Sequence, residues 1–123
     1  MPSDRRLARG VDAFNAGRFF AAHEIWEALW LDTVGPEKVL LQGLVQIAAG
    51  YAKVESGLRA GALKLLASGA RNIQQFLPAA EGLDLQSLAG AVAADIGRLQ
   101  AAPPTSVSLE VVDPPSLHTT RRS

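Results

Sequence analysis

The sequence predicts an all-α fold, a compact bundle of four to five helices followed by a non-helical C-terminal tail. Apolar residues recur at intervals of three and four in five segments of the chain, which is the period of an amphipathic helix. Gly17, Pro36, Gly57 and Pro78 mark boundaries between these segments. Of the 123 residues, 48% are hydrophobic and 20% are charged, the balance of an ordinary globular domain.

The first two helices are expected over residues 4–16 and 19–31. The first has an apolar face made by Leu7, Val11 and Phe14, and Gly17 can adopt the left-handed conformation that ends many helices. The second has a wide apolar sector and contains no lysine or arginine at all. A helix with so few solvating charges is typical of a protein interior, so we expect it to be a mostly buried, central helix.

Three further helices follow the same reasoning. The third is expected over residues 36–57 and begins with a proline, which is favoured in a first helical turn. The fourth is expected over residues 58–77, and the proline that follows ends it. The fifth is expected over residues 84–100, with the aspartate at its start as N-cap. Short loops between the helices favour antiparallel neighbours.

The end of the chain differs in composition from the rest. Residues 1–102 are expected to form a single helical domain, and residues 103–123 a tail that is disordered or lies on the surface. The tail contains four prolines and many serines and threonines, and such a segment buries little apolar area. Residues 107–111 alternate like a short strand but have no evident partner strand, so they are not counted as sheet.

Composition and charge exclude several classes of function. The chain has no cysteine, so disulfides and thiolate metal sites are excluded. The N-terminal residues are not followed by an apolar signal segment, and the most apolar stretch, residues 39–52, is too short to span a bilayer. Twelve basic and twelve acidic residues leave no strongly positive face. We expect a soluble cytoplasmic protein that binds neither nucleic acid nor a membrane.

The second expected helix carries the candidate site. Helical spacing places His23 and Glu27 side by side on one flank of its apolar sector, whereas Glu24 points further away. Trp26 and Trp30 fall within the apolar sector, where large aromatic side chains are usually packing anchors. The candidate polar residues of this helix are therefore His23 and Glu27, with Glu24 the weakest of the three.

A carboxylate at the border of a core needs partners, because burying it without them is costly. The third expected helix offers Gln42 and Gln46, which lie one turn apart, and beside them Gly43, a small residue that lets another helix approach closely. We therefore expect His23, Glu27, Gln42 and Gln46 to form a buried or half-buried structural polar network. If His23 fixes the packing of the helices in this way, the substitution His23→Ala should lower the melting temperature.

The alternative interpretation is a binding or catalytic site at the same cluster. His23-Glu24-x-x-Glu27 is similar to the zinc-protease motif His-Glu-x-x-His, but Glu27 replaces the second histidine and His118 lies in the expected tail. This cluster would then be a small-molecule or divalent-metal site, with hydrolysis as its chemistry. A metal site would need His23 and Glu27 as ligands, together with side chains from other helices. Because each catalytic template fails, the favoured function is a non-enzymatic interaction or self-association module without a cofactor, which binds a protein partner or a second copy.

Three blocks of sequence occur in an order that resembles a known family. They are the aromatic and His-Glu-x-x-Glu block at residues 17–30, the Leu-Gln-Gly and Ala-rich block at residues 41–51, and the Gly-x-x-x-Gly block at residues 57–61. Over about residues 8–77 the chain resembles the small bacterial and archaeal family known as domain of unknown function 309. Relatives often carry a histidine near the position of Lys53.

The resemblance implies an all-helical fold and no established activity. It places the polar signature of the family on five positions of this chain, which are His23, Glu24, Glu27, Gln42 and Gly43. These positions are therefore the ones expected to carry any function.

Overall fold

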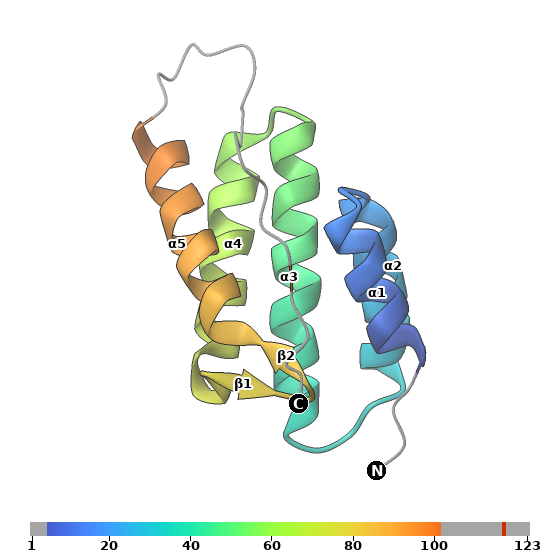
Figure 1. Cartoon of the computed structure of the whole chain (residues 1–123). Helices are drawn as coiled ribbons and strands as arrows, with labels where there is room; N and C mark the ends of the chain where they lie inside the picture. Colours follow the sequence, from blue (N-terminus) through green and yellow to red (C-terminus); the bar gives the residue numbers. More distant parts are fainter. Residues whose placement is uncertain (1–4, 102–116, 118–123) are drawn as a thin grey trace.

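The chain folds into consecutive helices, as shown by a computed structural model that describes residues 5–101 and residue 117. Within these residues there are five α-helices (Figure 1), so the predicted all-α bundle is confirmed. Their bounds are α1 Arg5–Asn15, α2 Phe19–Leu31, α3 Glu37–Glu55, α4 Arg59–Ile73 and α5 Leu85–Ala101.

The local signals at the helix ends work as predicted. Gly17 has a φ of 80°, the left-handed conformation that releases the chain from α1. Asp84 caps α5, because its carboxylate accepts a hydrogen bond of 3.1 Å from the backbone N–H of Ser87. The bounds of α2 agree with the prediction at both ends. Helix α4 ends earlier than predicted, and a 3₁₀ turn at Gln74–Phe76 replaces its last turn.

A small β-hairpin between α4 and α5 was not predicted. Strands β1 (Ala79–Ala80) and β2 (Leu83–Asp84) pair antiparallel, with Ala79 opposite Asp84 and Ala80 opposite Leu83. The two turn residues Glu81 and Gly82 both have positive φ, 52° and 75°, as a two-residue hairpin turn requires. Two-residue strands are too short to show an alternating pattern, which is why no pattern in the sequence predicted them.

Helix α3, and not α2, is the central helix. It packs against α2 on one side and against α4 on the other, while α1 packs on α2 and α5 on α4 (Figure 1). Nine residues of α3 are buried, whereas α2 buries only Phe19, Ala22, Trp26 and Leu29. The expectation of a mostly buried α2 is therefore wrong. Its lack of basic residues reflects an exposed face that is acidic and apolar, which the sequence pattern alone did not distinguish from burial.

The closest helix contact joins α3 to α4. A Cβ atom on Gly43 would lie 3.0 Å from the carbonyl oxygen of Gly69, and a Cβ on Gly69 would lie 2.8 Å from the carbonyl oxygen of Gly43. The two backbones therefore touch where neither residue has a side chain. The prediction that Gly43 allows a close approach is right, but the helix that approaches is α4 rather than α2.

Of the expected tail, the structure describes only Leu117, which is buried and lies in neither a helix nor a strand. The segment 107–111 and His118 lie outside the described residues, so the division at residue 102 stays a prediction. Among the helices of the described residues, none combines the length and the apolar character needed to cross a membrane.

Candidate functional site

One face of α2 points away from the rest of the protein. Phe20, Glu24, Glu27 and Leu31 recur at helical spacing and are all exposed, and we call them the α2 outer face. Phe20 and Leu31 are large hydrophobic residues with 61% and 65% of their surface accessible. The face therefore has an apolar residue at each end and two carboxylates in the middle.

The buried side of α2 is held by Trp26, which is fully buried as predicted for a packing anchor. Its indole Nε1 donates a hydrogen bond of 3.2 Å to the backbone carbonyl of Leu7 in α1. The ring lies against Gly10, where an added Cβ would be only 2.0 Å from the indole nitrogen. Trp30 packs only at the edge of the core, with the ammonium of Lys38 4.4 Å from its ring centroid.

Two nitrogen atoms beside the α2 outer face have no hydrogen-bond partner. They are His23 Nδ1 and Trp30 Nε1, and within the described residues no other buried side-chain nitrogen or oxygen is in this state. The two residues lie seven positions apart, which is two helical turns, so they share one flank of α2. The imidazole of His23 stacks on Phe20 with 5.9 Å between ring centroids. The fold thus gives His23 an aromatic contact but no partner for Nδ1.

The predicted polar network is not formed. Across the part of the chain that the structure describes, no hydrogen bond joins His23 or Glu27 to Gln42 or Gln46. Glu27 and Gln42 are exposed, and Gln46 accepts a hydrogen bond of 2.7 Å from the side chain of Asn72 in α4. The physical reason is the placement of α3, because its close contact is made with α4 and turns Gln46 toward that helix.

The metal alternative has few candidate ligands. Among residues 5–101 and 117 there is no group of three or more His, Asp or Glu side chains placed to hold a metal ion. His23 and Glu27, the two metal ligands expected from the sequence, both lie on α2. A metal or small-molecule site at this cluster stays a prediction.

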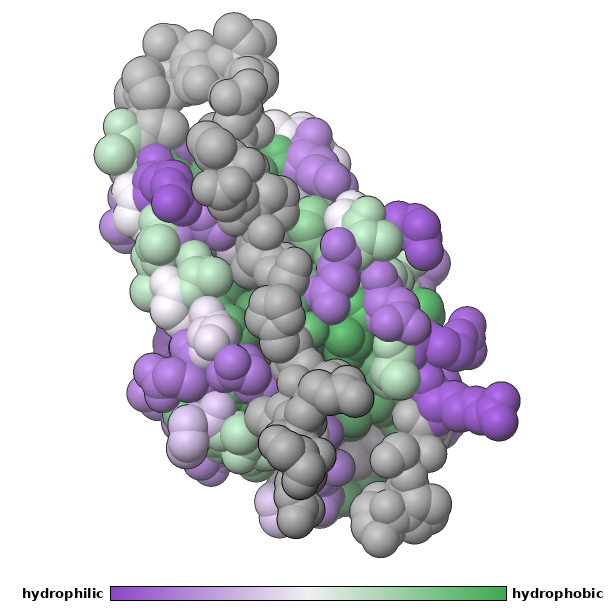
Figure 2. All heavy atoms as spheres, in the orientation of Figure 1, coloured by the Kyte–Doolittle hydropathy of each residue, from purple (hydrophilic) through white to green (hydrophobic). Residues whose placement is uncertain are grey.

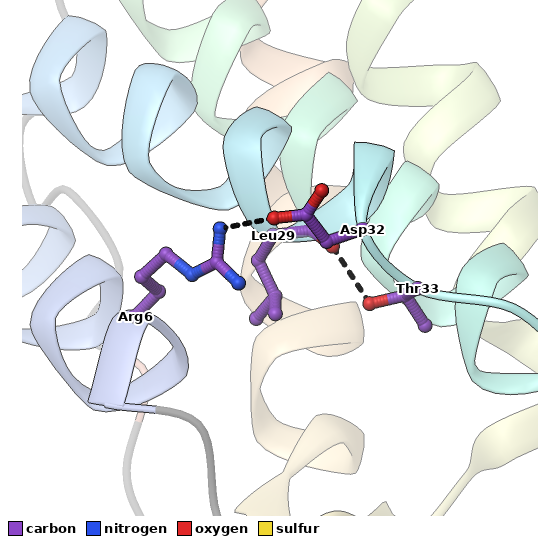
Figure 3. Close-up of polar contacts among 4 residues, drawn as sticks. All are labelled: Arg6, Leu29, Asp32 and Thr33. Carbon is purple, nitrogen blue, oxygen red and sulfur yellow. Dashed lines mark hydrogen bonds and ion pairs between the residues drawn. The ribbon is translucent and has the colours of Figure 1, made fainter.

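The C-terminal end of α2 is tied to α1 (Figure 3). A guanidinium nitrogen of Arg6 lies 2.9 Å from a carboxylate oxygen of Asp32, and Thr33 donates a hydrogen bond of 2.7 Å to the backbone carbonyl of Leu29. This ion pair is exposed, so its contribution to stability is below about 1 kcal/mol. Asp32 is thus paired with the guanidinium of Arg6, whereas Glu24 and Glu27 form no ion pair within the described residues.

A second polar cluster, on the other side of α3, was missed. Asp95 of α5 is buried, with 1% of its surface accessible, and its carboxylate accepts a hydrogen bond of 2.5 Å from the hydroxyl of Tyr51 and forms an ion pair with Arg98. Burial raises the pKa of Tyr51 far above its usual range, and the hydrogen bond and negative charge of Asp95 raise it further. The Tyr51–Asp95 pair is buried, and each of the two side chains has a hydrogen-bond partner, as expected of a structural element.

Tyr51 also connects the helices through its ring. The ring centroid lies 6.0 Å from that of Phe14 in α1 and 5.2 Å from that of Phe19 in α2. One side chain of α3 therefore contacts α1 and α2 with its ring and α5 with its hydroxyl. The signal for this cluster was an aspartate on the apolar stripe of α5, between Val92 and Leu99.

Comparison with known proteins finds a match to one family model and no activity. A family model described as a domain of unknown function (DUF309) matches residues 7–65, which confirms the resemblance predicted from the sequence. The match is slightly shorter than predicted, since it ends within α4, and it contains the whole α2 outer face. No curated protein matches the chain.

Proposed function

We propose that this chain, of which residues 7–65 match the DUF309 model, is a non-enzymatic interaction module of the cytoplasm. It binds a protein partner along the α2 outer face. The observation that carries the proposal is an exposed face with apolar ends and an unpaired acidic centre. His23 and Trp30 border this face and contribute hydrogen-bonding nitrogens that the fold itself leaves unused.

Exposed apolar area supports a covered surface. Three of the four large hydrophobic residues that are exposed in the described part of the chain lie on α2 or directly after it, and they are Phe20, Leu31 and Val34. Scattered single apolar residues on a surface are ordinary, but a group on one element is typical of an interaction site. Covering each side chain fully would contribute about 1.5–3 kcal/mol.

The charge of the face indicates the chemistry of the partner. The chain has no lysine or arginine between Arg18 and Lys38, so Glu24 and Glu27 give the face a local negative charge. Phe20 and Leu31 are eleven positions apart, or about 16 Å along the helix axis. The partner that fits is an amphipathic helix with two apolar side chains at this separation and basic side chains between them.

A second copy fits the same face less well. When the two-fold axis is perpendicular to α2, the two α2 helices run antiparallel and Phe20 of one copy lies opposite Leu31 of the other. The same operation brings Glu24 of one copy opposite Glu27 of the other. Like charges facing each other are unfavourable, and four carboxylates would meet at the centre of the interface. The charge pattern therefore favours a basic partner over self-association.

A defined peptide tests the proposal. The probe is a fluorescein-labelled helical peptide of about 18 residues, with leucines eleven positions apart and two lysines between them. We expect it to bind the full chain, and the double variant Glu24→Lys/Glu27→Lys to weaken binding at least about tenfold in fluorescence anisotropy. The matched control is Glu55→Lys/Glu81→Lys, which makes the same charge change at two exposed glutamates that are not part of α2 and should bind as the unmodified chain does.

Two results would overturn the proposal. The first is no binding of the peptide, or the same loss of affinity in both double variants, because neither outcome depends on the α2 outer face. The second is a dimer of the full chain in sedimentation that the substitution Phe20→Ser dissociates. That result would assign the face to self-association in place of a basic partner.

A further inference from the structure

A single residue of the C-terminal segment is held by a side chain of α1. Asn15, the last residue of α1, donates a hydrogen bond of 2.9 Å from Nδ2 to the backbone carbonyl of Leu117. Its Oδ1 accepts one of 2.6 Å from the backbone N–H of the same residue. A side-chain amide has a donor and an acceptor side by side, so it pairs with one peptide residue as a neighbouring strand would. This contact recognises an extended backbone and does not depend on the side chain at position 117.

The side chain of Leu117 adds selectivity. Only 1% of its surface is accessible, and it belongs to the same apolar core cluster as Val11 and Phe14 of α1. Leu117 lies in neither a helix nor a strand and is 102 residues away from Asn15 in the sequence. The helices of the bundle therefore do not supply this leucine. Apolar side chains gather on the face between α1 and α3 (Figure 2). The bundle thus holds a place for one leucine beside an amide that binds backbone.

We propose that the Asn15 end of α1 is a peptide-binding site for an extended segment that carries a leucine, and that the chain's own Leu117 fills it in cis. The two halves of the site have separate tasks, since the Asn15 amide binds the backbone and the apolar core accepts the leucine. No residue of the α2 outer face takes part. The inference is therefore independent of the function proposed above, and either can fail without the other.

Occupation in cis has a consequence for any competing peptide. A segment tethered by a short linker has an effective concentration of roughly millimolar at its site. A free peptide of the same chemistry therefore binds poorly while Leu117 is in place and well once it is removed. Leu117 therefore competes with any peptide that is added in trans.

Hydrogen exchange of the full chain tests the contact first. We expect the amide proton of Leu117 to exchange at least about tenfold more slowly than in a free peptide of the same sequence, because it is hydrogen-bonded to Asn15. The substitution Asn15→Ala should return it close to the free rate. The matched control is Asn72→Ala, which removes the asparagine that bonds to Gln46 elsewhere in the bundle and should leave Leu117 protected.

A peptide added in trans tests the site itself. The full-length variant Leu117→Ser vacates the leucine position, and the probe is a fluorescein-labelled peptide with the sequence of residues 113–121. We expect it to bind this variant at least about tenfold more tightly than the unmodified chain. It should not bind the double variant Asn15→Ala/Leu117→Ser, and a probe with serine in place of leucine should bind neither.

Each contrary result overturns the inference. A Leu117 amide that exchanges at the free rate in the unmodified chain would show that the contact does not persist, whatever the variants do. Equal binding of the peptide to the unmodified chain and to Leu117→Ser would show that Leu117 does not occupy the site. A dimer that dissociates on Leu117→Ser would show that the segment fills the site of a second copy, which overturns the assignment in cis.

Discussion

Buried polar groups on the two sides of α3 differ in whether they have hydrogen-bond partners. On the α5 side, the carboxylate of Asp95 is buried and receives both a tyrosine hydroxyl and an arginine. On the α2 side, His23 Nδ1 and Trp30 Nε1 are buried and have no hydrogen-bond partner. An unmade hydrogen bond in a buried place costs about 1–3 kcal/mol, so a fold under no other demand would pair or replace such groups.

This difference separates the structural cluster from the functional candidate. The Tyr51–Asp95 pair is complete within the chain and needs no partner to explain it. The flank of α2 is incomplete, and it borders the exposed apolar residues Phe20 and Leu31. The residues that the family resemblance marks, His23 and Glu27, lie on the incomplete side. Tyr51 and Asp95, which are not among the five positions of the polar signature, hold the helices together.

Removing the carboxylate of Asp95 should have the largest effect. The substitution Asp95→Ala leaves the Tyr51 hydroxyl buried without an acceptor and opens a space in the core. We expect the free energy of unfolding to fall by about 3 kcal/mol. Urea denaturation followed by circular dichroism measures it.

Asp95→Asn is the control for this prediction. It keeps an oxygen that can accept the Tyr51 hydrogen bond but removes the charge that pairs with Arg98. Because the Arg98 side chain is half exposed, the loss of the ion pair should cost only about 1 kcal/mol. If the alanine variant were no less stable than the asparagine variant, the Tyr51–Asp95 contact would not be the structural element described here.

The second effect is a dependence of stability on alkaline pH. Burial and the neighbouring Asp95 raise the pKa of Tyr51 in the folded state, while the unfolded chain keeps the ordinary value of about 10. The folded state therefore holds the proton more tightly, and its advantage is complete below about pH 10. Above that pH the unfolded tyrosine ionises first, and the free energy of unfolding should fall by about 1.4 kcal/mol per pH unit.

The chain offers a direct measurement of this effect, because Tyr51 is its single tyrosine. The ultraviolet absorbance of tyrosinate should appear near pH 10 in urea but only at higher pH, or on unfolding, in the native protein. The variant Tyr51→Phe controls for lysines, which ionise in the same range, and it should lack the additional loss of stability. A native titration centred near pH 10 would contradict the burial of this hydroxyl.

The helices were predictable because each depends on local patterns. The period of apolar residues located all five, Gly17 and Asp84 marked helix ends correctly, and α2 was bounded without error. The β-hairpin was missed because two-residue strands carry no pattern. The place of α2 in the bundle was also missed, since an acidic and apolar exposed face contains as few basic residues as a buried one.

The candidate site was less predictable because a helical wheel places residues within one helix and says nothing about neighbours. It put His23 beside Glu27 and Gln42 beside Gln46, but it did not tell which helix faces the two glutamines. That depended on the contact between Gly43 and Gly69, two residues distant in sequence. Asp95, in contrast, was detectable, because an acidic residue on an apolar stripe needs a buried partner.

Replacing His23 should change the stability of the protein least. Substituting His23 by leucine keeps an apolar side chain against Phe20 and removes a buried nitrogen that has no partner. We expect the free energy of unfolding to stay the same or to rise by up to about 1 kcal/mol. The same kind of change on the other side of α3, Asp95→Leu, removes a partnered group and should clearly destabilise the protein. Urea denaturation of the two variants, measured side by side, gives the contrast.

A loss of stability in His23→Leu comparable to that in Asp95→Leu would reverse this interpretation. It would show that His23 has a stabilising partner in solution and acts as a structural histidine, which is the role the sequence first predicted for it. An unchanged or higher stability means that the fold does not need the imidazole. The family signature at position 23 would then have to be explained by what binds to α2 rather than by what α2 packs against.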